Sequence, residues 1–163
     1  WDQIQLLEIL KRFENQQIPN IIPWLKSENN SVVEFALKLA KKYNQFEVKD
    51  TLIELLNHTN ETIRVQVIDA LNYFQVFEAK PILKDKFSSC TLNEQIAFFN
   101  FLETIYEGDD ESFLIEHVSH SNFEIKYSAL KILKNLNAET FKKIDFKNNN
   151  TEASKIYKFV ENN

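Results

Sequence analysis

The sequence contains very few residues that break regular secondary structure. One glycine and three prolines occur in 163 residues. Tight β-turns depend on these two residue types, so their scarcity argues against a meander of many short strands and favours a nearly all-helical chain. Apolar residues make up 44% of the sequence and include 14 phenylalanines, which is enough material for a buried core.

Cysteine, methionine and long apolar runs are also scarce. Cys90 is the single cysteine, which excludes an internal disulfide and a thiolate metal cluster. No apolar run reaches the roughly 18 residues that a membrane-spanning helix needs. The chain has no methionine and begins at Trp1, so we expect it to be a segment of a longer protein. We expect a cytoplasmic location, or the soluble part of a membrane-anchored protein.

A repeat of 31 residues passes through the chain four times without losing register. Small or apolar side chains recur at matching positions: Ala36, Val67, Phe98 and Ala129 in one column, and Ala40, Leu71, Leu102 and Leu133 in another. A period of this length is typical of solenoids. We therefore predict a single all-α domain over 1–163, with repeats at about 19–47, 48–78, 79–109 and 110–140 and partial repeats at 1–15 and 141–163.

Each repeat is predicted to consist of two helices. In the first repeat, helix A covers roughly 19–26 and helix B roughly 31–44. Pro19 and Pro81 share a position near the start of helix A, where proline is tolerated. One position before helix B always holds a residue that caps helices well: Asn29, Asn60, Thr91 and Asn122. The caps, the prolines and the apolar stripe agree on the same helix boundaries.

Two polar residues interrupt otherwise apolar columns in the third repeat. Lys84 stands where other repeats have isoleucine, and Glu94 stands where they have valine or isoleucine. We interpret both positions as half covered, with the stem of Lys84 on the core and its charge in water. A local opening of the array at the third repeat is the alternative.

Helix B resembles that of the HEAT repeat family, in particular bacterial-type HEAT-like helical hairpins. The family pattern is a cap, two residues, Val-Arg, two residues, Ala, three residues and Leu. The second repeat matches it with Asn60, Ile63-Arg64, Val67 and Leu71, and the fourth with Asn122, Ile125-Lys126, Ala129 and Leu133. Val33 and Glu94-Gln95 depart from it. The resemblance covers about 19–140 and implies a right-handed α-α superhelix that binds other molecules on the face lined by helix B.

The outward positions of helix B, equivalent to 34, 38, 41, 42 and 45, are the candidate binding face. Apolar side chains where solvent is expected predict an exposed ridge that binds a partner: Val65, Tyr73, Ile96 and Tyr127. Flanking lysines would set its orientation: Lys38, Lys41, Lys131 and Lys134. The alternatives are that neighbouring helices bury the ridge, and that the lysines only solvate the surface.

Other chemistry-bearing residues have simpler structural explanations. His117 and His120 have a spacing that two metal ligands can use, but His58 repeats the position of His120 at the turn between helices A and B. The acidic run at 107–111 lacks the ligand pattern of a calcium loop and is interpreted as a turn between repeats. We therefore predict no catalytic residue, no metal site and no cofactor.

The most direct interpretation is a non-enzymatic scaffold or adaptor that binds another protein, or another domain of its own chain. The alternative is a nucleic-acid-binding or DNA-repair enzyme, because helical-repeat DNA glycosylases share this architecture. The net charge is −5, and the lysines form two separated clusters rather than the continuous basic stripe that a phosphate backbone requires. We therefore do not expect a nucleic acid partner.

Overall fold

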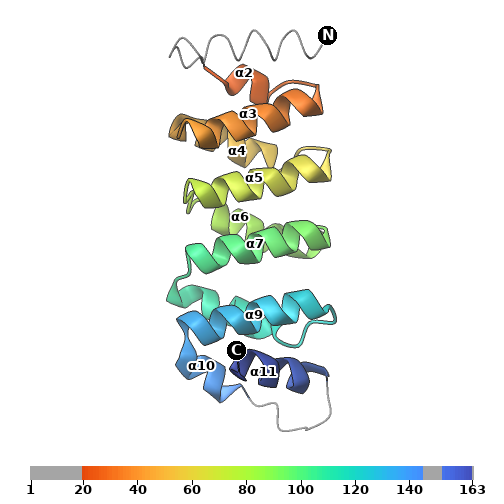
Figure 1. Cartoon of the computed structure of the whole chain (residues 1–163), viewed down its shortest axis with the longest axis vertical. Helices are drawn as coiled ribbons and strands as arrows, with labels where there is room; N and C mark the ends of the chain where they lie inside the picture. The colour runs from red at the N-terminus through yellow and green to blue at the C-terminus, as the bar shows by residue number, and fades with distance from the viewer. Residues whose placement is uncertain (1–19, 145–151, 163) are drawn as a thin grey trace. The chain divides into compact units, whose positions relative to one another are not determined.

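The computed structural model describes residues 20–144 and 152–162, and within these residues the chain is all-helical without a strand (Figure 1). The all-α prediction is therefore confirmed. The predicted partial repeat at 1–15 and Pro19 lie outside the described residues.

The chain divides into two compact halves, with the boundary between Ile82 and Leu83. The N-terminal half contains α2 (Ile22–Leu25), α3 (Asn30–Lys42), the 3-10 turn η1 (Phe46–Val48), α4 (Lys49–Leu55) and α5 (Glu61–Tyr73). Helix α6 (Ala79–Lys86) includes the boundary. The C-terminal half continues with η2 (Phe87–Ser89), α7 (Leu92–Thr104), η3 (Gly108–Asp110), α8 (Glu111–His117), α9 (Phe123–Leu136), α10 (Ala138–Lys143) and α11 (Glu152–Asn162).

The long helices follow the repeat of the sequence. Helices α3, α5, α7 and α9 are the four predicted B helices, and they begin at Asn30, Glu61, Leu92 and Phe123, each 31 residues after the one before. Helix A of the first repeat is shorter than predicted, since α2 covers only Ile22–Leu25 with Pro23 in its first turn. Within the C-terminal half, α11 lies against α9 and buries Ile156 and Val160, which are one period after Ile125 and Ala129. Helix α11 thus lies where the predicted partial repeat at 141–163 would place a B helix.

The predicted caps hold the start of every one of these four B helices. The side chains of Asn29, Asn60 and Asn122 accept hydrogen bonds from backbone N–H groups of the first turn, at 2.9, 3.3 and 2.8 Å respectively. These bonds satisfy donors that have no partner inside the helix. The backbone N–H of each cap is also bonded, by an acceptor two residues earlier: Ser27 Oγ, His58 Nδ1 and His120 Nδ1.

The third repeat satisfies its cap in another way, and this corrects the interpretation of Glu94. The Glu94 side chain is buried rather than half covered. Its Oε2 accepts a hydrogen bond from the Thr91 N–H at 2.9 Å, while Thr91 Oγ1 accepts one from the Glu94 N–H at 3.4 Å. This reciprocal pair is a capping box. Glu94 therefore supplies the acceptor that His58 and His120 supply in the neighbouring repeats.

The first two B helices end in the same turn. The N–H of Gln45 bonds to the Ala40 carbonyl at 2.9 Å, and the N–H of Val76 bonds to the Leu71 carbonyl at 3.0 Å, which closes the helix end over a left-handed residue. The left-handed residues are Asn44 and Gln75. The closure turns the chain inward, so Gln45 and Val76 are buried. The prediction that column 45 faces solvent is wrong at these two positions.

Gln75→Gly is expected to stabilise the protein. Gln75 has a φ of 52°, which is unfavourable for a residue with a Cβ, and its side chain is exposed. Glycine adopts this conformation without the Cβ clash, so the free energy of unfolding should rise by about 0.5–1 kcal/mol. Urea denaturation followed by circular dichroism measures the change. Gln66→Gly, inside α5, is the matched control and should lower stability by about 1 kcal/mol.

Each half has an apolar core. The N-terminal core contains Val33, Leu37, Leu52, Val67 and Leu71, all at most 1% exposed. The C-terminal core is rich in aromatic rings: Phe87 lies within 5.9 Å, centroid to centroid, of Phe98, Phe99, Phe113 and His117. The contacts with Phe99, Phe113 and His117 are edge-to-face, and such contacts add to the free energy gained by burying the rings.

Lys84 also differs from its predicted environment. Its ammonium group does not extend freely into water but forms an ion pair with Asp110 Oδ1, and the Asp110 side chain is completely buried. Asp110 Oδ2 accepts a hydrogen bond from the Glu107 N–H at 2.8 Å. The acidic run at 107–111 thus forms the predicted turn between repeats, and one of its carboxylates neutralises Lys84.

Candidate interaction surface

In the N-terminal half, the predicted ridge residues lie on α5 and differ in exposure. Tyr73 is 55% exposed, whereas Val65 is half-buried. The predicted lysines of this half lie on α3, where Lys38 is exposed and Lys41 is half-buried. Tyr73 is thus the ridge residue of this half that offers the largest free surface.

In the C-terminal half, Ile96 on α7 and Tyr127 on α9 are both half-buried. They occupy the same repeat position on helices that contact each other. Figure 1 shows α7, α9 and α11 side by side, with α9 between the other two. These three B helices therefore present one continuous face within this half.

An aromatic patch of Phe123, Tyr127 and Phe159 is the most exposed apolar feature of that face. Phe123 and Tyr127 are one turn apart on α9 and stack with ring centroids 6.2 Å apart. Phe159 on α11 lies 6.3 Å from the Tyr127 ring. Phe123 is 50% and Phe159 56% exposed. The patch thus joins the predicted Tyr127 to two exposed rings from adjacent helices.

Sequence reasoning missed both of those phenylalanines. Phe123 is the first residue of α9, and the first residue of α7, Leu92, is also apolar and 38% exposed. The sequence signal for this position is an apolar residue directly after the cap in two successive B helices. Phe159 gave no comparable signal, because its column also contains Phe35, Gln66, Ala97 and Ser128.

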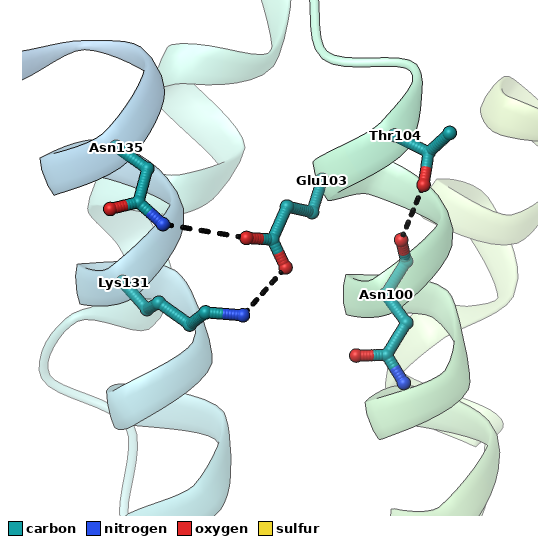
Figure 2. Close-up of polar contacts among 5 residues, drawn as sticks. All are labelled: Asn100, Glu103, Thr104, Lys131 and Asn135. Carbon is teal, nitrogen blue, oxygen red and sulfur yellow. Dashed lines mark hydrogen bonds and ion pairs between the residues drawn. The ribbon is translucent and has the colours of Figure 1, made fainter.

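The predicted lysines of the C-terminal half interact within the chain. Figure 2 shows Lys131 Nζ at 2.9 Å from Glu103 Oε2, and Asn135 Nδ2 donating to Glu103 Oε1 at 3.5 Å. Next to them, Thr104 Oγ1 donates to the Asn100 carbonyl at 3.2 Å. Lys134 Nζ donates to the Val160 carbonyl at 2.6 Å and so caps the end of α11. These lysines connect neighbouring B helices.

A related charge pairing with reversed signs occurs in the N-terminal half. Lys41 and Asp69 occupy the two repeat positions that Glu103 and Lys131 occupy in the C-terminal half. Partial desolvation raises the pKa of the Asp69 carboxyl, and the charge of Lys41 lowers it in part. The predicted cluster of Lys38 and Lys41 is thus partly neutralised by an acidic residue of the next repeat.

The histidines have structural roles. His58 and His120 accept the cap N–H groups described above, as their shared repeat position predicts. His117 is buried among Phe87, Phe99 and Phe113, and its Nδ1 lies 2.7 Å from the Phe113 carbonyl oxygen. Among residues 20–144 and 152–162, no three His, Cys, Asp or Glu side chains are placed to share a metal ion.

Comparisons with known proteins supply no family or relative. No family model, no curated protein and no solved structure matches this chain. Within the described part of the chain, no helix combines the length and the hydropathy that passage through a bilayer requires.

Proposed function

We propose that the chain forms a HEAT-like solenoid, a right-handed α-α superhelix, that binds another protein on the face of its B helices without catalysis. The equal 31-residue steps between B helices support the repeat architecture. The side-by-side arrangement of α7, α9 and α11 supports a face on which one ligand can contact several repeats.

The observation that carries the proposal is the aromatic patch. Phenylalanine is not required at position 123, because the equivalent first residues of α3 and α5 are Asn30 and Glu61. Two half-exposed phenylalanine rings on either side of Tyr127 cost free energy in water, and a partner that covers them recovers about 25 cal/mol per Å² of apolar surface. Aromatic side chains are enriched at the centres of protein interfaces.

The charges on the same face support a protein ligand. A nucleic acid backbone needs a continuous row of available cations. Here Lys131 is paired with Glu103, and Lys134 is bonded to a carbonyl oxygen of α11. We therefore propose that the patch provides affinity, and that the mixed charges of Lys131, Glu103 and the exposed Lys158 orient the bound segment.

Affinity capture from a lysate of the source cells tests the proposal. The wild type is compared with Phe123→Glu/Phe159→Glu, which removes two exposed rings, and with Ile115→Glu, which changes an apolar residue on α8 that is 44% exposed. All three should give the same circular dichroism spectrum. We expect the double variant to retain at least about tenfold less partner protein than the wild type, because hot-spot aromatic residues contribute about 2 kcal/mol or more to binding. Equal retention by all three proteins, or salt-sensitive retention of duplex DNA instead of a protein, contradicts the proposal.

A further inference from the structure

The two polar residues of the Lys84–Asp110 pair both depart from the repeat, and they do so together. The position of Lys84 holds isoleucine in the other three repeats, at Ile22, Ile53 and Ile115. The position of Asp110 is apolar at Val48, Ala79 and Phe141, and it is glutamine at Gln17. The matching pairs Ile22/Val48, Ile53/Ala79 and Ile115/Phe141 are thus apolar, whereas Lys84 and Asp110 form an ion pair.

The environment makes this pair very different from a surface ion pair. The Asp110 side chain is 0% exposed and that of Lys84 is 22% exposed. The Lys84 ammonium also lies 5.8 Å from the centroid of the Phe113 ring. In surroundings of such low polarity, two matched charges give little net stability compared with two apolar side chains, but one unmatched charge is costly.

In a repeat protein each repeat must pack against its correct neighbour, although all the repeats have similar shapes. A surface that packs against the next repeat also resembles the surfaces of all the other repeats, so wrong pairings and exchange of repeats between copies are characteristic errors. At these two positions, apolar pairs such as Ile53 and Ala79 do not distinguish one junction from another. A charged pair does, because either of its members pays a desolvation penalty at any apolar junction.

We infer that the Lys84–Asp110 pair ensures that the third repeat packs against the fourth repeat and not against another repeat surface. The pair contributes specificity in assembly rather than stability. It acts during folding and refolding, and it is independent of the partner-binding face, since its residues lie on α6 and η3.

The double variant Lys84→Ile/Asp110→Ala tests this inference, because it gives the junction the residues that Ile53 and Ala79 provide in this same chain. The wild type, the double variant and each single variant are unfolded in urea and refolded at several protein concentrations. Stability is read from the denaturation midpoint, and mispairing from the fraction of oligomer by size-exclusion chromatography with light scattering. Because Asp110→Ala also removes the acceptor of the Glu107 N–H, we expect the double variant to have a midpoint close to that of Asp110→Ala alone and above that of Lys84→Ile alone. We expect its oligomer fraction to be several-fold higher than that of the wild type and to increase with protein concentration.

Two results overturn the inference. A double variant that refolds with the same oligomer fraction as the wild type shows that the pair does not control pairing. A double variant with a lower midpoint and an unchanged oligomer fraction shows that the pair serves stability alone. The single variants verify that the pair is formed, because Lys84→Ile should lower the midpoint and the added Asp110→Ala should raise it again in part.

Discussion

Phe87→Ala will lower the free energy of unfolding of the C-terminal half by about 3–5 kcal/mol. The Phe87 ring is 5% exposed and contacts four other rings, so its removal leaves a cavity that Phe98, Phe99, Phe113 and His117 line together. Rings held by one another cannot easily move to fill such a space, which places the cost in the upper part of the range for buried aromatic residues.

Urea denaturation followed by circular dichroism measures this loss, and hydrogen exchange locates it. Phe123→Ala is the matched control: the same residue type, in the same half, with a ring that is 50% exposed. We expect it to change stability by only about 0.5 kcal/mol. Amides of α7, α8 and α9 should exchange faster in Phe87→Ala, because repeats unfold in part independently of one another. Similar losses for the two variants would show that the aromatic cluster is not the core of this half.

Lys84→Ile will be the more harmful of the two single changes at the Lys84–Asp110 pair, with a loss of about 3–5 kcal/mol. It removes the ammonium group that forms an ion pair with the completely buried Asp110 carboxylate. Asp110→Ala leaves Lys84 without a partner instead, but the partly exposed side chain of Lys84 can extend its ammonium group into water. That change should therefore cost only about 1–3 kcal/mol.

The order of these two losses is a sharper test than their size. It follows from the difference in exposure of the two side chains, which the denaturation midpoints report directly. Lys158→Ile, at an exposed lysine of α11, controls for the general effect of replacing lysine by isoleucine and should change stability by about 0.5 kcal/mol. A greater loss for Asp110→Ala would contradict this order and would indicate that the hydrogen bond from the Glu107 N–H contributes more than the ion pair.

The regular features of the fold were predictable because they depend on residues close in sequence. An asparagine cap satisfies N–H groups two or three residues away, so Asn60 and Asn122 mark the starts of α5 and α9 without any tertiary information. Glu94 was open to the same reasoning, since Thr91-x-x-Glu94 has the spacing of a capping box. The apolar column by itself does not indicate this capping role of Glu94.

Other features depend on packing that the repeat period does not specify. Lys84 and Asp110 are 26 residues apart, and nothing local to either residue indicates its partner. The inward turn that buries Gln45 and Val76 follows from left-handed backbone at Asn44 and Gln75, where the sequence has no glycine to indicate it. For the candidate site, the sequence predicted Tyr127 but not Phe159, because only the position of α11 against α9 brings that ring to Tyr127.

Site-specific photo-crosslinking tests the proposed binding face most directly. The photoreactive residue p-benzoyl-phenylalanine replaces Phe123 in one protein and Ile115 in another, and both are irradiated in the source cells. Both positions are apolar and about half exposed, but they lie on α9 and α8 respectively. The account predicts a covalent adduct with a partner protein from position 123 and none from position 115. An adduct only from position 115, or from neither position, would contradict a partner-binding face on the B helices.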